Sequence, residues 1–197
     1  MHKLKYSSFY ITLIVLLVLS ACAVNNETKD WKTFQIEEEP ALNIKFKLPP
    51  GWRIDYAPAR EKQGQWNIAL VPPKCSADQA EDYKQSCVNI TAHVKDVSAF
   101  EREMFFERTS GDIPLSQDGS RIAKIIGNDI FKVSGKKVER FDHLIKTAAG
   151  DVKMSAYFLE TKNAYFIFIT SLPYEEAETS DVALNFGLML KSIRETK

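Results

Sequence analysis

The sequence predicts an α+β fold in which a mainly antiparallel β-sheet packs against helices. Three long strand patterns follow one another at Lys136–Lys146, Val152–Leu159 and Tyr165–Leu172, and only short polar turns separate them. Short connections of this kind favour antiparallel pairing. The third strand is apolar on both faces, so each face needs a cover. An amphipathic helix from about Glu175 to Arg194 supplies part of that cover.

The first half of the domain is predicted to contain shorter strands and one helix. The segment Pro49-Pro50-Gly51-Trp52 is a strong turn signal. Ser98 and Glu101 have the spacing of a capping box, which predicts a helix that continues to about Ser110. Alternating apolar residues predict strands at Thr33–Glu37, Ile44–Leu48, Arg53–Tyr56, Trp66–Val71 and Val88–Lys95.

The N-terminal segment is typical of an export signal. Lys3 and Lys5 precede an apolar run from Phe9 to Leu19, and small residues follow it. The run is too short to span a bilayer, because a membrane-spanning helix needs roughly 20 apolar residues. Leu19-Ser20-Ala21-Cys22 resembles the lipobox of bacterial lipoprotein precursors. The alternative is an ordinary signal peptide cut near Ala21 or Ala23, with an incidental Cys22.

The lipobox resemblance implies lipidation of Cys22 and cleavage in front of it. Residues 1–21 are then the signal peptide, residues 22–30 a lipidated tether, and residues 31–197 a single domain. Stable anchoring needs two or more acyl chains, and the lipobox chemistry supplies them. In lipoproteins similar to this one, the residue after the cysteine directs sorting, and Ala23 implies the outer membrane, with the periplasmic side expected.

Two further cysteines, Cys75 and Cys87, remain once Cys22 carries lipid. An oxidising periplasm allows such a pair to persist as a disulfide, which would close a polar surface loop. Their spacing is far from the Cys-x-x-Cys pattern of redox-active pairs, and two thiols with His93 and His143 do not make a metal ligand set. We therefore expect neither a metal nor another cofactor.

The charge balance argues against nucleic-acid binding. The chain has 26 basic and 26 acidic residues and no basic cluster after Cys22, whereas nucleic-acid binding needs a basic face. The expected partners are the membrane, through the N-terminal lipid, and an envelope protein. Tyr56, Trp52 and Trp66 flank the Pro/Gly turn region and are the candidate partner surface.

The order of elements resembles the superfamily shared by PsbP, the Ran guanine-nucleotide-release factor and the bacterial DcrB-like lipoproteins. Phe46-Lys47-Leu48-Pro49-Pro50-Gly51-Trp52 carries the likeness near the start. Tyr165-Phe166-Ile167-Phe168-Ile169-Thr170 and the helix with Phe186 and Ile193 carry it at the end. The resemblance implies a PsbP-like α/β/α sandwich, an antiparallel sheet between helical layers, and a non-enzymatic binding role.

We find no catalytic motif in the sequence that would contradict a non-enzymatic role. Asp142 and His143 are adjacent on a strand and must point to opposite faces, so they cannot form a relay. His143 is expected to be a partly buried structural imidazole, and His93 to be solvated. The leading hypothesis is therefore a membrane-anchored periplasmic binding or accessory module. A carrier or sensor of a small apolar ligand is the alternative, and an enzyme with an unrecognised site is the third possibility.

Overall fold

The computed structural model describes residues 28–60, 62–73, 88–116, 119 and 121–196. The predictions about Cys22, about Cys75 and Cys87, and about the signal peptide fall outside these residues. The described part contains an eight-stranded sheet in the order β3-β4-β5-β10-β9-β8-β7-β6 and a three-stranded sheet in the order β1-β2-β11. All strand pairs are antiparallel, which confirms the α+β fold class.

The elements of the first half are β1 (Lys32–Phe34), β2 (Ile44–Leu48), β3 (Arg53–Pro58), β4 (Gln65–Val71), β5 (Val88–Val94) and α2 (Arg102–Thr109). The second half contains β6 (Ile113–Pro114), β7 (Ile122–Val133), β8 (Lys136–Thr147), β9 (Gly150–Glu160), β10 (Ala164–Pro173), the 3-10 turn η2 (Tyr174–Glu176), α3 (Asp181–Ser192) and β11 (Arg194–Glu195).

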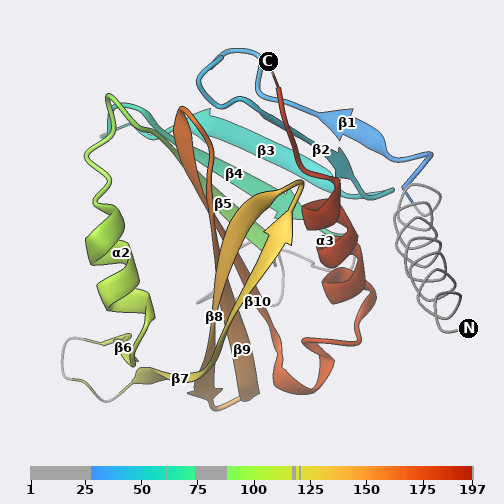
Figure 1. Cartoon of the computed structure of the whole chain (residues 1–197). Coiled ribbons are helices and arrows are strands. Elements are labelled where there is room, and N and C mark those ends of the chain that lie inside the picture. Colours follow the sequence, from blue (N-terminus) through green and yellow to red (C-terminus); the bar gives the residue numbers. More distant parts are fainter. Residues whose placement is uncertain (1–27, 61, 74–87, 117–118, 120, 197) are drawn as a thin grey trace, which may run out of the picture.

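The large sheet lies between two layers (Figure 1). Helix α2 covers one face, while α3 and the small sheet cover the other. Two neighbouring residues of β9 point to opposite faces of the sheet, and each contacts a different layer. The Phe158 ring lies 5.0 Å from the Phe106 ring of α2, and the Tyr157 ring lies 5.3 Å from the Phe186 ring of α3. The sandwich arrangement that the sequence resemblance implied is therefore present.

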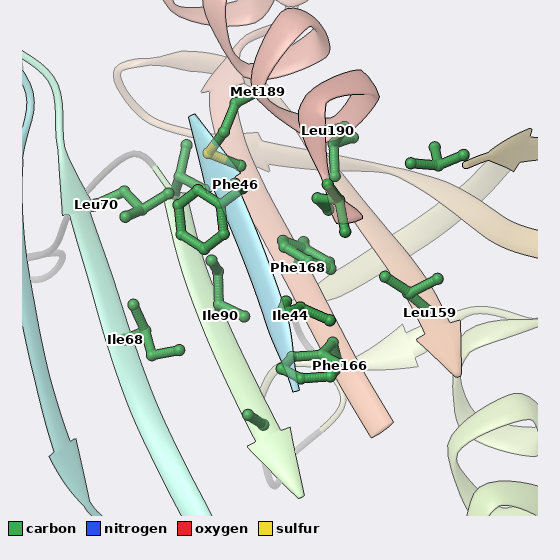
Figure 2. Packing of buried hydrophobic residues seen from close by; sticks show 14 of the residues in the cluster. Ile44, Phe46, Ile68, Leu70, Ile90, Leu159, Phe166, Phe168, Met189 and Leu190 are labelled. Carbon is green, nitrogen blue, oxygen red and sulfur yellow. The ribbon is translucent and has the colours of Figure 1, made fainter. Parts of the chain in front are cut away.

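The main hydrophobic core lies between the large sheet and the layer that contains α3. Figure 2 shows Phe46 and Ile44 of the small sheet beside Phe166 and Phe168 of β10, with Met189 of α3 next to them. These five side chains are each at least 95% buried. Apolar residues at every second position of β4, β5 and β10 produce this core, because successive strand side chains point to opposite faces.

Three predicted elements differ from the structure, and one strand was not predicted. Helix α2 begins at Arg102 with Glu101 as N-cap and no side-chain cap, because the Ser98 hydroxyl bonds the His93 ring instead. The capping-box prediction was therefore wrong. Helix α3 begins only at Asp181, since Ser180 caps it by accepting a hydrogen bond from the Ala183 N–H. Strand β1 ends at Phe34, three residues earlier than predicted, and the long strand β7 was not predicted.

Candidate protein-interaction surface

The first candidate for chemistry, the Asp142–His143 pair, is divided between the two faces of β8. His143 is fully buried on the α2 side, where its Nε2 lies 3.1 Å from the Gly111 carbonyl oxygen. Burial lowers the pKa of His143 and outweighs the opposing effect of that carbonyl. Asp142 points to the opposite layer. The expected separation is confirmed, and the buried His143 is neutral and structural.

His93 is buried, so the expectation that it is solvated was wrong. Only 8% of the residue is exposed, because the Phe100 ring covers it at a centroid distance of 4.6 Å. Its Nδ1 lies 2.9 Å from the Ser98 hydroxyl oxygen. Burial, followed by the positive charge of Lys62, lowers the pKa of His93 to about 4. Among the described residues no carboxylate bonds either histidine, so the Ser98–His93 contact is not a catalytic dyad supported by an acid.

A charged cluster lies on the α3 side of β8 and β9. The Asp142 Oδ2 atom lies 3.3 Å from Arg140 Nη2 and 3.1 Å from Lys153 Nζ, and Lys153 also pairs with Glu178. Burial alone would lower the pKa of Lys153, but the hydrogen bonds and charges of Glu178 and Asp142 outweigh it and raise that pKa. The two positive and two negative charges of this cluster balance one another, which is typical of a structural ion-pair network.

Two spaces among the described residues are candidate ligand sites. A cavity of about 10 Å³ lies between the two sheets, which is room for one water molecule at most. A hollow of about 250 Å³ lies at the corner formed by β2, the β7–β8 turn and β11. Its ionic groups are already paired, because Lys136 Nζ and Glu195 Oε2 are 2.7 Å apart. Pockets for small molecules usually measure roughly 300–1,000 Å³, so neither space favours a carrier.

The aromatic surface predicted at Trp52, Tyr56 and Trp66 is only partly present. Trp52 belongs to the core and is 7% exposed, because it follows the Pro49–Gly51 turn that directs it inward. Tyr56 and Trp66 remain half-exposed neighbours with ring centroids 6.4 Å apart. Tyr56 donates its hydroxyl hydrogen to Glu38. A two-ring patch therefore replaces the predicted three-residue surface.

The larger apolar surface lies along strand β7 at the other end of the sheet. Strand β8 pairs with one side of β7, but on the other side β6 pairs only with Ile122 and Ala123. Within the described residues, 124–133 therefore have no partner strand on this side. Ile122, Ile126 and Ile130 are 40%, 45% and 62% exposed. The strand register places Ile130 on the α2 side of the sheet and Ile122 on the opposite side. We call this strand edge, residues 124–133 with the three exposed isoleucines, the β7 edge.

The β7 edge carries features that limit uncontrolled strand pairing. A register shift between Ile125 and Gly127 marks a β-bulge at Ile126. Asp112 accepts the Ile125 N–H at 3.0 Å, and the Asp129 carboxylate accepts the N–H of Ile130 at 2.8 Å. Bulges and charged residues protect natural edge strands from aggregation. A partner must therefore recognise the isoleucine side chains and cannot simply extend the ladder along the whole strand.

Sequence reasoning missed the β7 edge, although a signal was present. Three isoleucines recur at intervals of four residues, which imitates a helix rather than a strand. The following Gly127-Asn128-Asp129 has the composition of a turn. The β-bulge accounts for both the helix-like spacing and the turn-like composition, because it interrupts the regular alternation of side chains at Ile126.

Other site types find no support in the described ranges. No group of three or more potential metal ligands occurs among these residues. No helix in the same ranges is long and apolar enough to cross a membrane. The lipidation site Cys22 and the predicted disulfide of Cys75 and Cys87 stay predictions.

No protein-family profile matches the chain, and no curated protein matches it. Solved structures do match. Cyanobacterial PsbP from Synechocystis sp. PCC 6803 has 10% identity and a TM-score of 0.48, covering 83% of this chain and 91% of that one. The Ran-binding protein Mog1p of Saccharomyces cerevisiae has 12% identity and a TM-score of 0.41, with coverages of 85% and 96%.

A protein of unknown function from Pseudomonas aeruginosa, described as a putative regulator, matches with 10% identity and a TM-score of 0.37. The match covers 81% of this chain and 94% of that one. PsbP and a Ran-binding protein are thus among the solved structures that match, as the resemblance in the sequence led us to expect. Identities this low concern the arrangement of helices and strands and say nothing about function.

Proposed function

We propose that this protein is a lipid-anchored, non-enzymatic binding module of the bacterial cell envelope, and that its β7 edge contacts an envelope protein. The observation that carries the proposal is the exposure of Ile122, Ile126 and Ile130 on a sheet edge that no other described strand pairs with over residues 124–133. The partner we infer presents an apolar, extended segment to these side chains.

Two further observations support a binding role over the alternatives. The cavity of about 10 Å³ is too small for the apolar ligand of a carrier. The histidines are buried and neutral, and neither bonds a carboxylate of the described residues. Large apolar side chains that stay exposed along a sheet edge are candidates for an interaction site. The membrane location rests on the lipobox-like Leu19-Ser20-Ala21-Cys22 alone.

Photo-crosslinking tests the partner surface. A photoreactive amino acid is placed at Ile130 of the full chain, produced in its own cell envelope, and a matched control places it at Asp55 of the opposite edge strand β3. The expected result is a discrete protein adduct from position 130 and none from position 55. The substitution Ile126→Lys should weaken the adduct without changing the melting temperature, because Ile126 is exposed.

Absence of an adduct at position 130, or equal adducts at both positions, contradicts the assignment of the β7 edge. An adduct with twice the protein's own mass identifies a second copy of this chain and contradicts the accessory role. The anchor is tested separately by mass analysis of the mature N-terminal peptide and by fractionation of Cys22→Ser. Unmodified peptide mass, or unchanged outer-membrane recovery of the variant, contradicts lipidation.

A further inference from the structure

A cluster of positive charges lies on the outer surface of the layer formed by α3 and the small sheet. Both elements pack on the same face of the large sheet, where Phe46 of β2 and Phe186 of α3 join one core (Figures 1 and 2). Their outward side chains therefore share the opposite surface. On β2, Lys45 and Lys47 alternate with the inward residues Ile44 and Phe46.

Two more cations join these lysines from distant parts of the chain. Arg194 of β11 lies directly opposite Lys45 in the strand register, and Lys191 is exposed at the end of α3. We call Lys45, Lys47, Lys191 and Arg194 the basic face. Like charges directly opposite one another destabilise a sheet, and no carboxylate in the described part of the chain forms an ion pair with any of the four.

The arginine of the basic face also has a structural role. Arg194 Nη1 donates to the carbonyl oxygens of Lys191 and Ile193 at 2.9 and 2.7 Å, which caps the C-terminal end of α3. These carbonyls and the Ser134 hydroxyl oxygen hold the guanidinium group in place, and no carboxylate of the described residues pairs with it. The folded chain thus fixes several positive charges on one surface at an energetic cost that an external anion would remove.

Apolar residues adjoin the basic face on the outward side of α3. Leu184 is 56% exposed, and Leu188 and Lys191 follow at helical spacing, opposite the buried Phe186 and Met189. Leucines beside lysines are typical of helices that lie in a membrane interface. Asp181 adds a negative charge at the far end of the helix, about 15 Å from Lys191 at 1.5 Å per residue.

From these contacts we infer that the basic face, with Leu184 and Leu188, lies on a membrane surface that contains anionic phospholipid. The inference deepens the proposed function, because it rests on lipidation of Cys22. Strand β1 pairs with β2 and begins at Lys32, ten residues after Cys22. Such a segment reaches at most about 35 Å, so the small sheet is the part of the domain closest along the chain to the anchor.

Quenching by brominated lipid tests this orientation. The lipidated full-length protein carries a fluorescent amino acid at Leu184, and in a matched control at Val97, which is exposed in the connection between β5 and α2. Each is reconstituted into vesicles of phosphatidylethanolamine with or without phosphatidylglycerol, both containing brominated acyl chains. We expect quenching at position 184 only with phosphatidylglycerol, loss of that quenching in high salt, and no quenching at position 97.

Charge-reversal variants test whether the bilayer contact depends on the lysines of the basic face or only on the net charge of the protein. Lys45→Glu with Lys47→Glu should weaken the bilayer contact at least about 25-fold, taking roughly fivefold for each lysine lost near an anionic surface. The control pair Lys62→Glu with Lys146→Glu makes the same change at exposed positions elsewhere and should leave the quenching intact.

The possible failures are distinguishable. Protein that does not float with the vesicles contradicts the lipid anchor and the inference together. Protein that floats without quenching at position 184, or with quenching independent of phosphatidylglycerol, overturns the orientation alone. A photoreactive group at position 184 that captures a protein in cell envelopes, rather than lipid, overturns it in favour of an acidic protein partner.

Discussion

Lys136 and Glu195 join the β7–β8 hairpin to the last strand of the small sheet, with the Nζ and Oε2 atoms 2.7 Å apart. The other carboxylate oxygen of Glu195 accepts hydrogen bonds from the Asn43 amide and the Lys162 N–H, each at 3.1 Å. Lys136 first, and then Lys162, hold the pKa of Glu195 at about 2. One carboxylate thus connects four segments that are distant in sequence.

We expect Glu195→Gln to lower the free energy of unfolding by about 1 kcal/mol at pH 7, because the charge on a partly exposed pair is lost while a hydrogen-bond acceptor remains. The pKa of Glu195 is depressed in the folded state, so this stabilisation is complete above about pH 4.5 and disappears as the pH falls through 2. Urea unfolding of both proteins across this range measures the difference. Glu176→Gln, at an exposed residue, is the control, and an equal effect of the control would contradict the role of the pair.

His93 gives a second pH dependence of the same sign, in a higher pH window. Its pKa falls from 6.5 to about 4 in the folded protein, so above pH 6.5 the ring is neutral in both states. Below pH 6.5 the unfolded chain takes up a proton first, and stability is lost progressively down to about pH 4. At about 1.4 kcal/mol per pH unit the loss approaches about 3 kcal/mol.

The variant His93→Gln should therefore show a flatter dependence of unfolding free energy on pH between 6.5 and 4, even though it is less stable at pH 7.5 after losing the Phe100 contact. His143 remains in the variant and continues to titrate, so some slope persists. Chemical unfolding at four or more pH values measures both slopes. Identical slopes for the two proteins would show that His93 does not titrate differently on folding.

Gly64, in the turn between β3 and β4, is expected to tolerate no side chain. Its φ of 71° is in the left-handed region, and a Cβ atom there would lie 2.5 Å from Val97 Cγ2 and 3.0 Å from the Ser98 nitrogen. We expect Gly64→Ala to cost about 2–3 kcal/mol. Gly135→Ala is the matched control, because its φ is 80° but a Cβ atom meets nothing within 4 Å, and about 1 kcal/mol is expected there. Equal losses in thermal or urea unfolding would show that the contacts with Val97 and Ser98 are irrelevant.

The second half of the fold could be predicted because its signals are local. Strands β8, β9 and β10 combine long alternating patterns with short turns, and the predicted bounds match within two residues. Strand β7 could not be predicted in this way, because Gly127 and Asn128 interrupt its pattern and a bulge shifts its register. The Tyr56–Trp66 pair was found from its proximity to a turn, whereas the burial of Trp52 depends on tertiary packing.

The errors at His93 and Ser98 have one cause. Along β5 the residues on the side of His93 are polar, which indicates a solvated face, but Phe100 arrives from the next segment and covers the ring. The same fold places Ser98 against His93, so its hydroxyl is not available to cap α2. The basic face was missed for a related reason. Lys45, Lys47, Lys191 and Arg194 are separated by up to 149 residues, and they come together only through the β2–β11 pairing and the packing of the end of α3 against β2.

The core beneath α3 should be the most sensitive part of the protein to truncation. Phe168 is fully buried, and its ring lies 6.5 Å from that of Phe166 and 6.4 Å from that of Phe186. Phe168→Ala removes contacts between the central strand and the helix and leaves a cavity, so a loss of about 3–5 kcal/mol is expected. Val97→Ala, at a residue that is 48% exposed, should change stability by less than about 0.5 kcal/mol. Urea unfolding monitored by circular dichroism compares the two, and a loss below about 1 kcal/mol for Phe168→Ala would mean that α3 does not depend on this contact for its position.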